Sequence, residues 1–490
     1  MNSAREQRLL ESIPTGLLIG GKWRDSASGN RFAVEDPATG ETLTTVADAS
    51  VVDAKAALDA ASAVQREWAA TSPRTRGEIL RRAFEAVHAR ADDFALLMTL
   101  EMGKAIAESH AEVNYGAEFL RWFSEEAVRV DGRYTTAPDG GSRLLVTKRP
   151  VGPSLLITPW NFPLAMATRK IGPAIAAGCT MILKPADLTP LTSLLLAQVL
   201  LDSGLPAGVL NVIPTTSAAQ TTEPLFHDPR LRKLSFTGST GVGQKLLQQA
   251  STTVLRTSME LGGNAPFLVF DDADVEAAVD GAVAAKLRNI GEACTAANRF
   301  LVHEDVADAF ATKLADRFTA KTIGRGTDDG VEIGPLVDRR SREKVGSLVD
   351  DAIEKGATVL AGGAVVPGAG WFYQPTVLTD VPPAARVLTE EIFGPVAPIV
   401  TFRTDDEAIE VANGTPFGLV AYAYTRDLDR VIRLSERLET GMLGINTGIV
   451  SNPAAPFGGV KQSGLGREGG SEGIEEYLET VYVGIAQPGS

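Results

Sequence analysis

Cys294 is the residue of this chain best suited to covalent chemistry. It lies in the segment LRNIGEACTAANR (287–299), where an apolar helical run ends at Arg288 and a short loop turns at Gly291. A substrate can reach a thiol on such a loop, and the thiolate form attacks carbonyl carbon atoms. The alternative is a buried, inert cysteine, the commonest fate of a free thiol. This segment alone leaves both interpretations open.

Asn161 follows an apolar stretch that is typical of a buried strand, and Glu260 stands at the close of a strand. Two prolines stiffen the turn around Asn161, whose amide could donate a hydrogen bond to a developing oxyanion. Glu260 precedes a Gly-Gly turn, and among apolar neighbours its carboxyl group should have a raised pKa and suit a general base. An ordinary turn asparagine and an exposed glutamate at a strand end are the alternatives.

Two further segments have features of a nucleotide site. Lys184 and Asp187 follow an apolar strand, and an ammonium beside a carboxylate at a sheet edge can bind the hydroxyls of a ribose. In FTGSTGVG (236–243) a strand leads into a helix, where Gly238 and Ser239 suit a phosphate because free N–H groups point outward at a helix N-terminus. The spacing G-x-x-G-x-G differs from the usual dinucleotide fingerprint. A solvated charge pair on a loop is the alternative for the first segment.

Length, charge and cysteine usage exclude several classes of protein. A chain of 490 residues is too long for one compact core, so we expect two or three domains. The net charge of −14 argues against a nucleic-acid partner. Two cysteines cannot form a disulfide framework, and they favour a reducing compartment, the cytoplasm. No histidine has metal-ligand spacing, so we expect no metal. We also expect no secretory signal and no membrane segment, since the apolar stretches are short and interrupted.

Strand and helix patterns alternate along most of the chain, which predicts parallel sheets with helices on both faces. Amphipathic helices are expected at 52–68, 75–102 and 104–128. A first series of strands is expected at 154–157, 180–183, 209–213 and 233–236, and a second at 267–270, 300–303, 396–402 and 420–424. The sequence therefore predicts two α/β domains, with Cys294 and Glu260 near their junction, and a projecting hairpin at 132–151.

Together these segments resemble motifs of the aldehyde dehydrogenase superfamily. The matches are PWNFP (159–163), KPA (184–186), FTGS (236–239), MELGG (259–263), Gly291 to Cys294, EEIFGP (390–395) and PFGGVK (456–461), in the order found in the family. The resemblance implies an α/β fold of two parallel-sheet domains plus a small β oligomerisation element. The dinucleotide-binding domain would comprise 1–131 and 152–261, the catalytic domain 262–455, and the oligomerisation element 132–151 and 470–490.

The resemblance also implies a role for each matching residue. Cys294 would be the nucleophile, Glu260 the general base, and Asn161 with the backbone N–H of Cys294 the oxyanion hole. Lys184 would bind the adenine ribose of NAD or NADP, Ser239 the pyrophosphate and Glu391 the nicotinamide ribose, with Phe393 beside it. The expected cofactor-binding residues are in full Trp160, Lys184, Asp187, Gly238, Ser239, Glu391 and Phe393. Such a protein oxidises an aldehyde to an acid through a thiohemiacetal and a thioester, and is expected to be a homodimer or homotetramer.

Two arginines indicate an aldehyde with a distal carboxylate. Arg169 lies two helical turns after Asn161, Arg288 lies just before the cysteine loop, and guanidinium groups bind carboxylates bidentately. Succinate-semialdehyde dehydrogenases carry arginines at both matching positions and a serine at that of Ser451, and this chain is similar to them in MATRK (166–170) and KQSGLGRE (461–468). We therefore expect Arg169→Ala and Arg288→Ala to raise KM for succinate semialdehyde far more than for an uncharged aldehyde. A structural salt bridge is the alternative for either arginine.

Two positions depart from patterns in the family. Ala296 stands where some members carry a second cysteine that forms a redox lock, so we expect no such switch. Asp187 stands where many NAD-using members have a glutamate; its charge should repel a 2′-phosphate, but its shorter stem leaves room, so NAD is only slightly favoured over NADP. Oxidation of glutarate semialdehyde or of an aromatic aldehyde, and a non-catalytic role on the same scaffold, are the alternative functions.

Overall fold

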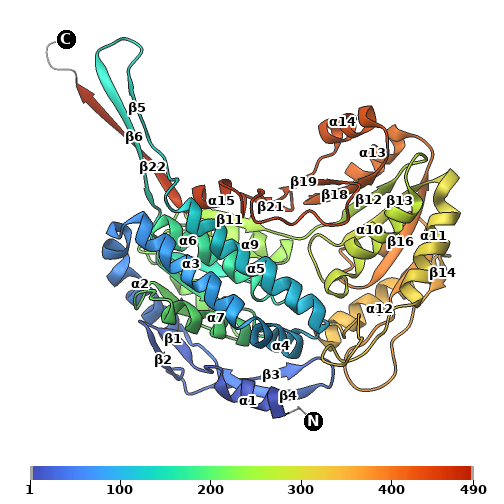
Figure 1. Ribbon diagram of the computed structural model, residues 1–490, viewed down its shortest axis with the longest axis horizontal. Coiled ribbons are helices and arrows are strands. Elements are labelled where there is room, and N and C mark those ends of the chain that lie inside the picture. Colours follow the sequence, from blue (N-terminus) through green and yellow to red (C-terminus); the bar gives the residue numbers. More distant parts are fainter. Residues whose placement is uncertain (1–3, 487–490) are drawn as a thin grey trace.

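Two β-sheets with helices on both faces form two lobes, and a long β-arm projects from one of them (Figure 1). The computed structural model describes residues 4–486. Within that range no helix combines the length and the apolar character that a membrane crossing requires.

The first sheet is parallel at its centre and antiparallel at its edges. Its strands run in the order β2-β1-β9-β8-β7-β10-β11-β21. Their bounds are β1 Leu17–Ile19, β2 Lys22–Arg24, β7 Ser154–Ile157, β8 Met181–Lys184, β9 Leu210–Val212, β10 Lys233–Thr237, β11 Arg256–Glu260 and β21 Gly464–Leu465. The parallel strands from β9 to β11 confirm the predicted series. Parallel neighbouring strands have their carboxyl ends on the same side of the sheet. That side carries the residues that end these strands or follow them closely: Asn161, Lys184, Ser239 and Glu260.

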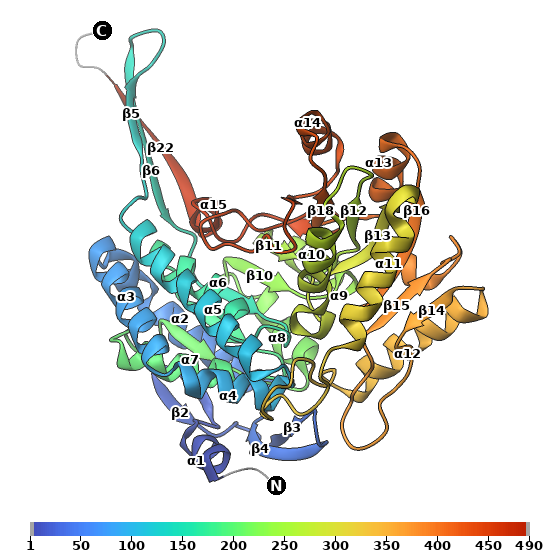
Figure 2. The ribbon, with the colours of Figure 1, turned by 45° about the vertical axis from the view of Figure 1, so that its right-hand side comes forward.

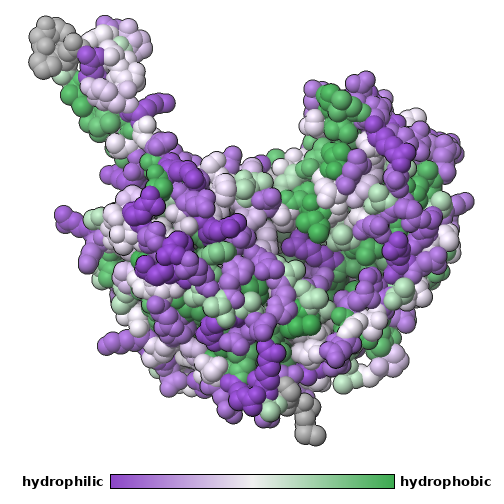
Figure 3. Space-filling model, in the orientation of Figure 1, coloured by the Kyte–Doolittle hydropathy of each residue, from purple (hydrophilic) through white to green (hydrophobic). Residues whose placement is uncertain are grey.

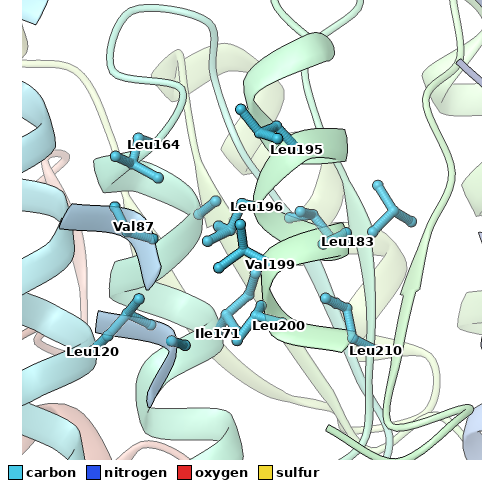
Figure 4. Close-up of a cluster of buried hydrophobic side chains, with 14 of the residues drawn as sticks. Val87, Leu120, Leu164, Ile171, Leu183, Leu195, Leu196, Val199, Leu200 and Leu210 are labelled. Atoms are coloured by element: carbon cyan, nitrogen blue, oxygen red, sulfur yellow. The ribbon is translucent and has the colours of Figure 1, made fainter. Parts of the chain in front are cut away.

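Successive side chains of each strand in the first sheet point to opposite faces, and each face packs against helices in its own apolar core. Leu155 and Ile157 belong to the core with α2, α8 and α9, whereas Leu156 belongs to the core with α3, α5, α6 and α7. Figure 4 shows the second core, where Leu183 and Leu210 of the sheet meet leucines of α7. The helices of this lobe are α1 Ala4–Ser12, α2 Val51–Ala70, α3 Pro73–Ala89, α4 Ala91–Met102, α5 Ile106–Glu126, α6 Ala165–Ala177, α7 Leu191–Asp202, α8 Ala218–Phe226, α9 Thr240–Ser251 and α15 Glu472–Glu475.

The predicted helix at 75–102 is wrong as a single element, since the chain breaks at Arg90 into α3 and α4. Arg90 leaves the helical conformation, with φ −113° and ψ 25°. Asp92 and Asp93 then stand in the first turn of α4, where carboxylates favour a helix N-terminus. The break lets α4 take a new direction in which nearly all of its residues from Phe94 onward are buried.

The second sheet has the order β14-β15-β16-β13-β12-β18-β19, parallel except at the β14 edge. The strands predicted near 267, 300, 396 and 420 form its centre. Its bounds are β12 Ala265–Val269, β13 Ala297–His303, β14 Thr358–Ala361, β15 Thr376–Thr379, β16 Val396–Phe402, β18 Val420–Tyr424 and β19 Met442–Ile445. One face packs on α10 Val275–Leu287, α11 Glu304–Thr319 and α12 Arg339–Glu354, and the other on α13 Asp405–Asn413 and α14 Leu428–Arg437.

The arm is a separate antiparallel sheet in the order β22-β6-β5. β5 Arg133–Thr136 and β6 Ser142–Pro150 form the predicted hairpin, and β22 Leu478–Ala486 pairs along the whole of β6 (Figure 2). Tyr134, Tyr482, Val483 and Ile485 are exposed on it, and Figure 3 shows hydrophobic residues along the arm. The last four residues of the expected oligomerisation element, 487–490, lie outside the described residues.

Residues 456–469, which the expected domain boundaries left unassigned, return to the first sheet. There β21 pairs with β11, so that Gly464 lies opposite Glu260. The remaining elements are the hairpin of β3 Arg31–Asp36 and β4 Glu41–Ala47, the pair of β17 Phe417–Gly418 and β20 Val460–Lys461, and the 3-10 turns η1 Arg288–Gly291 and η2 Arg386–Leu388. This return of the chain brings a late segment of the sequence onto the candidate site.

Candidate active site

Cys294 lies on a sharply bent loop between α10 and β13. Asn289, Ile290 and Gly291 have φ values of 53°, 61° and 78°. A side chain at Gly291 would put its Cβ 2.3 Å from the carbonyl oxygen of Gly394, so glycine alone fits there. The predicted pivot at Gly291 is confirmed, and the β-branched Ile290 adds backbone strain that the surrounding structure must hold. Cys294 follows, half-buried.

Asn161 is joined directly to this loop. Its Nδ2 donates to the carbonyl oxygen of Glu292 at 3.0 Å, while Nδ2 of Asn289 donates to the carbonyl oxygen of Asn161 at 3.0 Å. An amide nitrogen facing a carbonyl fixes which way the Asn161 side chain is turned, and it leaves a second N–H for another acceptor. The structure thus brings together the turn of Asn161 and the loop of Cys294, which lie far apart in the sequence.

Glu260 is deeply buried, at 2% exposure, and neither of its carboxyl oxygens makes a hydrogen bond. Burial, and after it the charge of Glu468, holds the pKa of Glu260 well above its usual value. The raised pKa that the sequence predicts is therefore confirmed. Gly458 faces the carboxyl group, where a Cβ would lie 3.0 Å from Oε1.

The thiol of Cys294 is protonated at neutral pH in this arrangement. Burial raises its pKa to about 12; the guanidinium of Arg169 opposes the shift, the carboxylates of Glu391 and Glu260 add to it, and Arg288 opposes it. The thiolate considered from the sequence is therefore not the resting form. Proton removal has to accompany attack on a substrate.

A buried cluster around Glu468 was not predicted from the sequence. Glu468 forms ion pairs with Lys170 and, at 2.8 Å, with Arg169. Arg169 is 2% exposed and its guanidinium carbon lies 3.9 Å from the ring centre of Phe457. The structural salt bridge that the sequence left open for Arg169 exists through Nη2, whereas Nε of Arg169 is buried without a hydrogen bond. The only signal was that Lys170 and Glu468 fall within motifs shared with the family.

Arg288 has a different environment. Its Nη1 lies 3.5 Å from Oγ of Ser451, and its guanidinium packs over the rings of Phe162 and Tyr115 at 4.9 and 5.6 Å. Among residues 4–486 Arg288 forms no ion pair, although its charge acts on the buried Glu108, where it opposes the rise in pKa that burial causes. The structure thus places Arg288 beside Ser451, as expected, with its charge unpaired. The aromatic residues that frame it were not predicted.

The expected phosphate site is a helix N-terminus. Ser239 is the N-cap of α9 and is exposed, and its side chain makes no capping hydrogen bond. A Cβ at Gly238 would lie 2.5 Å from the ring of Phe236, and one at Gly241 would meet nothing within 4 Å. The open first turn with free N–H groups suits the pyrophosphate of a dinucleotide.

Lys184 lies at the end of strand β8, which β7 separates from β10, and its ammonium is buried close to Asp187. Burial lowers the pKa of Lys184, and the charge of Asp187 opposes that shift. The two groups thus interact, as the sequence predicts, at the same sheet edge as Ser239. Their arrangement fits the hydroxyls of a ribose.

Trp160, Phe393 and Glu391 meet on the other side of this edge. The rings of Trp160 and Phe393 pack edge to face at 5.4 Å, and Phe393 has a φ of 55°. Oε1 of Glu391 accepts from the N–H of Gly263 at 3.2 Å, and burial raises the pKa of Glu391. The three residues come from two segments of the chain, and the charge of Glu391 acts on Cys294, an arrangement that fits a nicotinamide nucleotide. Among the described residues no cluster of three or more metal-ligating side chains occurs.

The chain is similar to known proteins over nearly its whole length. Residues 23–483 match the model of the aldehyde dehydrogenase family. The chain is 63% identical over 446 residues, 91% of this chain and 99% of the relative, to a succinate-semialdehyde dehydrogenase of Paenarthrobacter nicotinovorans. It is 49% identical to the NADP(+) succinate-semialdehyde dehydrogenase GabD of Escherichia coli (96% of this chain, 97% of the relative). The crystal structure of succinate-semialdehyde dehydrogenase from Burkholderia pseudomallei has a TM-score of 0.96 and 47% identity, covering 99% of this chain and 100% of that one. The chain belongs to the aldehyde dehydrogenase family.

Proposed function

We propose that the protein oxidises an aldehyde to a carboxylic acid by covalent catalysis, with Cys294 as nucleophile, Glu260 as general base and the amide of Asn161 as oxyanion donor. The observation that carries this proposal is the direct bond from Asn161 Nδ2 to the loop of Cys294. It ties the amide to the loop that carries the thiol, and the buried carboxyl group of Glu260, which makes no hydrogen bond, acts electrostatically on that thiol. An unpartnered buried polar group of this kind needs a functional reason.

In the first step the thiol of Cys294 passes its proton to the carboxylate of Glu260, which releases it to solvent, as sulfur bonds to the aldehyde carbon. The carbonyl oxygen becomes an oxyanion, which accepts hydrogen bonds from the second N–H of Asn161 and from the backbone N–H of Cys294. A bound nicotinamide dinucleotide supplies the hydride acceptor, and a thioester on Cys294 remains. Glu260 then takes a proton from water as the water oxygen attacks the thioester. The carbon–sulfur bond breaks, the acid leaves and the thiol is regenerated.

Two variants test the assignment of roles. Cys294→Ala should lose turnover and keep its fold, as measured by circular dichroism. Glu260→Gln should release one reduced cofactor per site in a burst and then stall, because the thioester forms but is not hydrolysed. Ordinary steady-state turnover in either variant contradicts the mechanism.

We propose succinate semialdehyde as the substrate, with its distal carboxylate bound by Arg288 and Ser451 and by Nε of Arg169. The unpaired guanidinium of Arg288 and the proximity of Ser451 support this choice. So does the name of the two relatives, succinate-semialdehyde dehydrogenase. A carboxylate in this pocket would satisfy Nε of Arg169, which is buried without a hydrogen bond.

A cavity next to Arg288 favours glutarate semialdehyde as the second candidate. It has a volume of about 420 Å³, reaches Phe162 and Arg288, and is lined by apolar groups such as Val283, Leu287 and Ile333. A substrate longer by one methylene could shift toward this space. An aromatic aldehyde would leave Arg288 unpaired, so it is disfavoured. Initial rates with the two semialdehydes, butanal and benzaldehyde, each with NAD and with NADP, decide among these.

For the cofactor we propose NAD(P), with NAD slightly preferred because the charge of Asp187 beside Lys184 should repel a 2′-phosphate. The Escherichia coli relative is named for NADP, so the ratio of kcat/KM for the two cofactors is the relevant measurement. Asp187→Asn should raise kcat/KM for NADP more than for NAD.

We further propose a cytoplasmic homodimer or homotetramer in which the arm contacts a second copy. The exposed Tyr482, Val483 and Ile485 on β22 support this. Light scattering after size exclusion gives the mass in solution. Removing residues 478–486 should lower it, and an unchanged mass contradicts the role of the arm.

A further inference from the structure

Lys104 and Glu112 form a buried ion pair beneath the turn that carries Asn161. Lys104 follows α4 and Glu112 lies on α5; they are 0% and 2% exposed. Their Nζ and Oε2 atoms lie 2.5 Å apart. Taking two charges out of water is unfavourable unless further hydrogen bonds satisfy both groups. The bonds that satisfy this pair all lead to the segment 161–165.

Glu112 binds the start of helix α6. Its Oε1 accepts from the backbone N–H of Leu164 at 2.9 Å and of Ala165 at 3.1 Å. The N-cap residue of α6 is Leu164, which has no side chain able to cap. A carboxylate from α5 therefore supplies the missing acceptor, and its charge suits the positive end of the helix.

Lys104 binds Asn161 itself. Its Nζ donates to the carbonyl oxygen of Asn161 at 2.8 Å and lies 4.3 Å from the ring centre of Phe162. That carbonyl oxygen also accepts from Nδ2 of Asn289, on the loop of the nucleophile. The peptide of Asn161 is thus held from two sides, by the ion pair and by the loop of Cys294.

We propose that the Lys104–Glu112 ion pair is the positioning device for the oxyanion-stabilising amide of Asn161. This rests on the proposed role of that amide. Lys104 and Glu112 act through Asn161: they hold its backbone so that the free N–H of its side chain points at the carbonyl oxygen of the substrate. Small displacements of such a donor reduce the rate strongly.

The test is a double-mutant cycle that combines Lys104→Met with Asn161→Ala. Lys104→Met alone should lower kcat by about 10–100-fold, the range for a misplaced oxyanion donor. KM and the dissociation constant of NAD should stay within about threefold, because binding is not the step affected. In the Asn161→Ala background the same change should lower kcat by less than about threefold, since no donor remains to be positioned.

Glu101→Gln is the matched control. Glu101 is also a buried carboxyl group, and it accepts from the N–H groups of Leu191 and Thr192 at the start of α7 rather than from the segment 161–165. It should leave kcat within about threefold. If Lys104→Met does not fold, Glu112→Gln takes its place, because it removes the charge and keeps a capping oxygen.

The outcomes separate this inference from the proposed function. An equal loss of kcat in both backgrounds would mean a merely structural ion pair and would overturn the inference, as would an undiminished kcat in Lys104→Met. A kcat unchanged in Asn161→Ala itself would overturn the oxyanion role, and the inference with it. A loss confined to the background that retains Asn161 supports both.

Discussion

Replacing Arg288 by methionine tests whether the protein selects an aldehyde by its distal carboxylate. Methionine keeps an unbranched apolar stem between Tyr115 and Phe162 and removes the charge. A hydrogen bond to a charged group contributes about 1.5–3 kcal/mol. At about 1.4 kcal/mol per factor of ten, that is about 10–150-fold in kcat/KM. Because Arg288 is only half-buried, solvent weakens the contact and the lower part of that range is expected.

The measured quantity is the ratio of kcat/KM for succinate semialdehyde to that for butanal. The ratio is needed because Arg288 also lowers the pKa of Cys294. Its loss raises that pKa and slows attack on any aldehyde. The ratio should fall about 10–30-fold in Arg288→Met. Arg288→Lys should give a smaller fall, since it keeps the charge without the fork. A proportional loss for both aldehydes, or no loss, refutes carboxylate recognition by Arg288.

Three other perturbations follow from the same geometry. Arg169→Met should slow the oxidation of both succinate semialdehyde and butanal, because it leaves the buried Glu468 with a partner missing. The sequence instead predicts a loss mainly for succinate semialdehyde. A loss in steady-state kinetics confined to that aldehyde contradicts a structural role of the ion pair. The rate of alkylation of Cys294 by iodoacetamide, followed by mass spectrometry, should keep rising above pH 10, since only the thiolate reacts and the thiol pKa is about 12. Glu391→Gln removes a charge that raises this pKa, so the dependence of the alkylation rate on pH should move to lower pH. An unmoved pH dependence contradicts the effect of Glu391 on the thiol. Gly291→Ala should lower the free energy of unfolding by about 1–3 kcal/mol in urea titrations, because of its φ of 78° and the clash with Gly394; wild-type stability contradicts the strain.

Arg169 and Arg288 have different ion-pair partners because they lie in different environments. Arg169 sits on α6, whose residues from 165 to 177 are all buried, so its charge needs a permanent partner. Arg288 stands at the end of α10, where the loop opens to a cavity, and it keeps its charge free for a ligand. Sequence spacing treats both as equivalent because it records only their distance from Asn161 and Cys294.

The sequence by itself determined the central strands of both sheets and the order in which they follow one another along the chain. A buried parallel strand is an uninterrupted apolar run, as in 154–157, and it can be recognised without knowing its neighbours. The same pattern indicated which residues follow strand ends, and with them Asn161, Lys184 and Glu260. The sequence also indicated that the chain turns at Gly291, because a glycine shortly before the reactive cysteine can be recognised without knowing its neighbours in space.

The tertiary structure alone decided which distant groups touch. The edge strands β2 and β21 are three and two residues long, too short to show a periodic pattern, so pairing with β1 and with β11 defines them. Nothing local to Lys104 or Glu468 indicates that one holds Asn161 and the other raises the pKa of Glu260. The protonated state of Cys294 likewise depends on burial and on charges from four separate segments. Such pKa values and contacts depend on every group that lies nearby in the folded protein, and the sequence pattern does not record which groups those are.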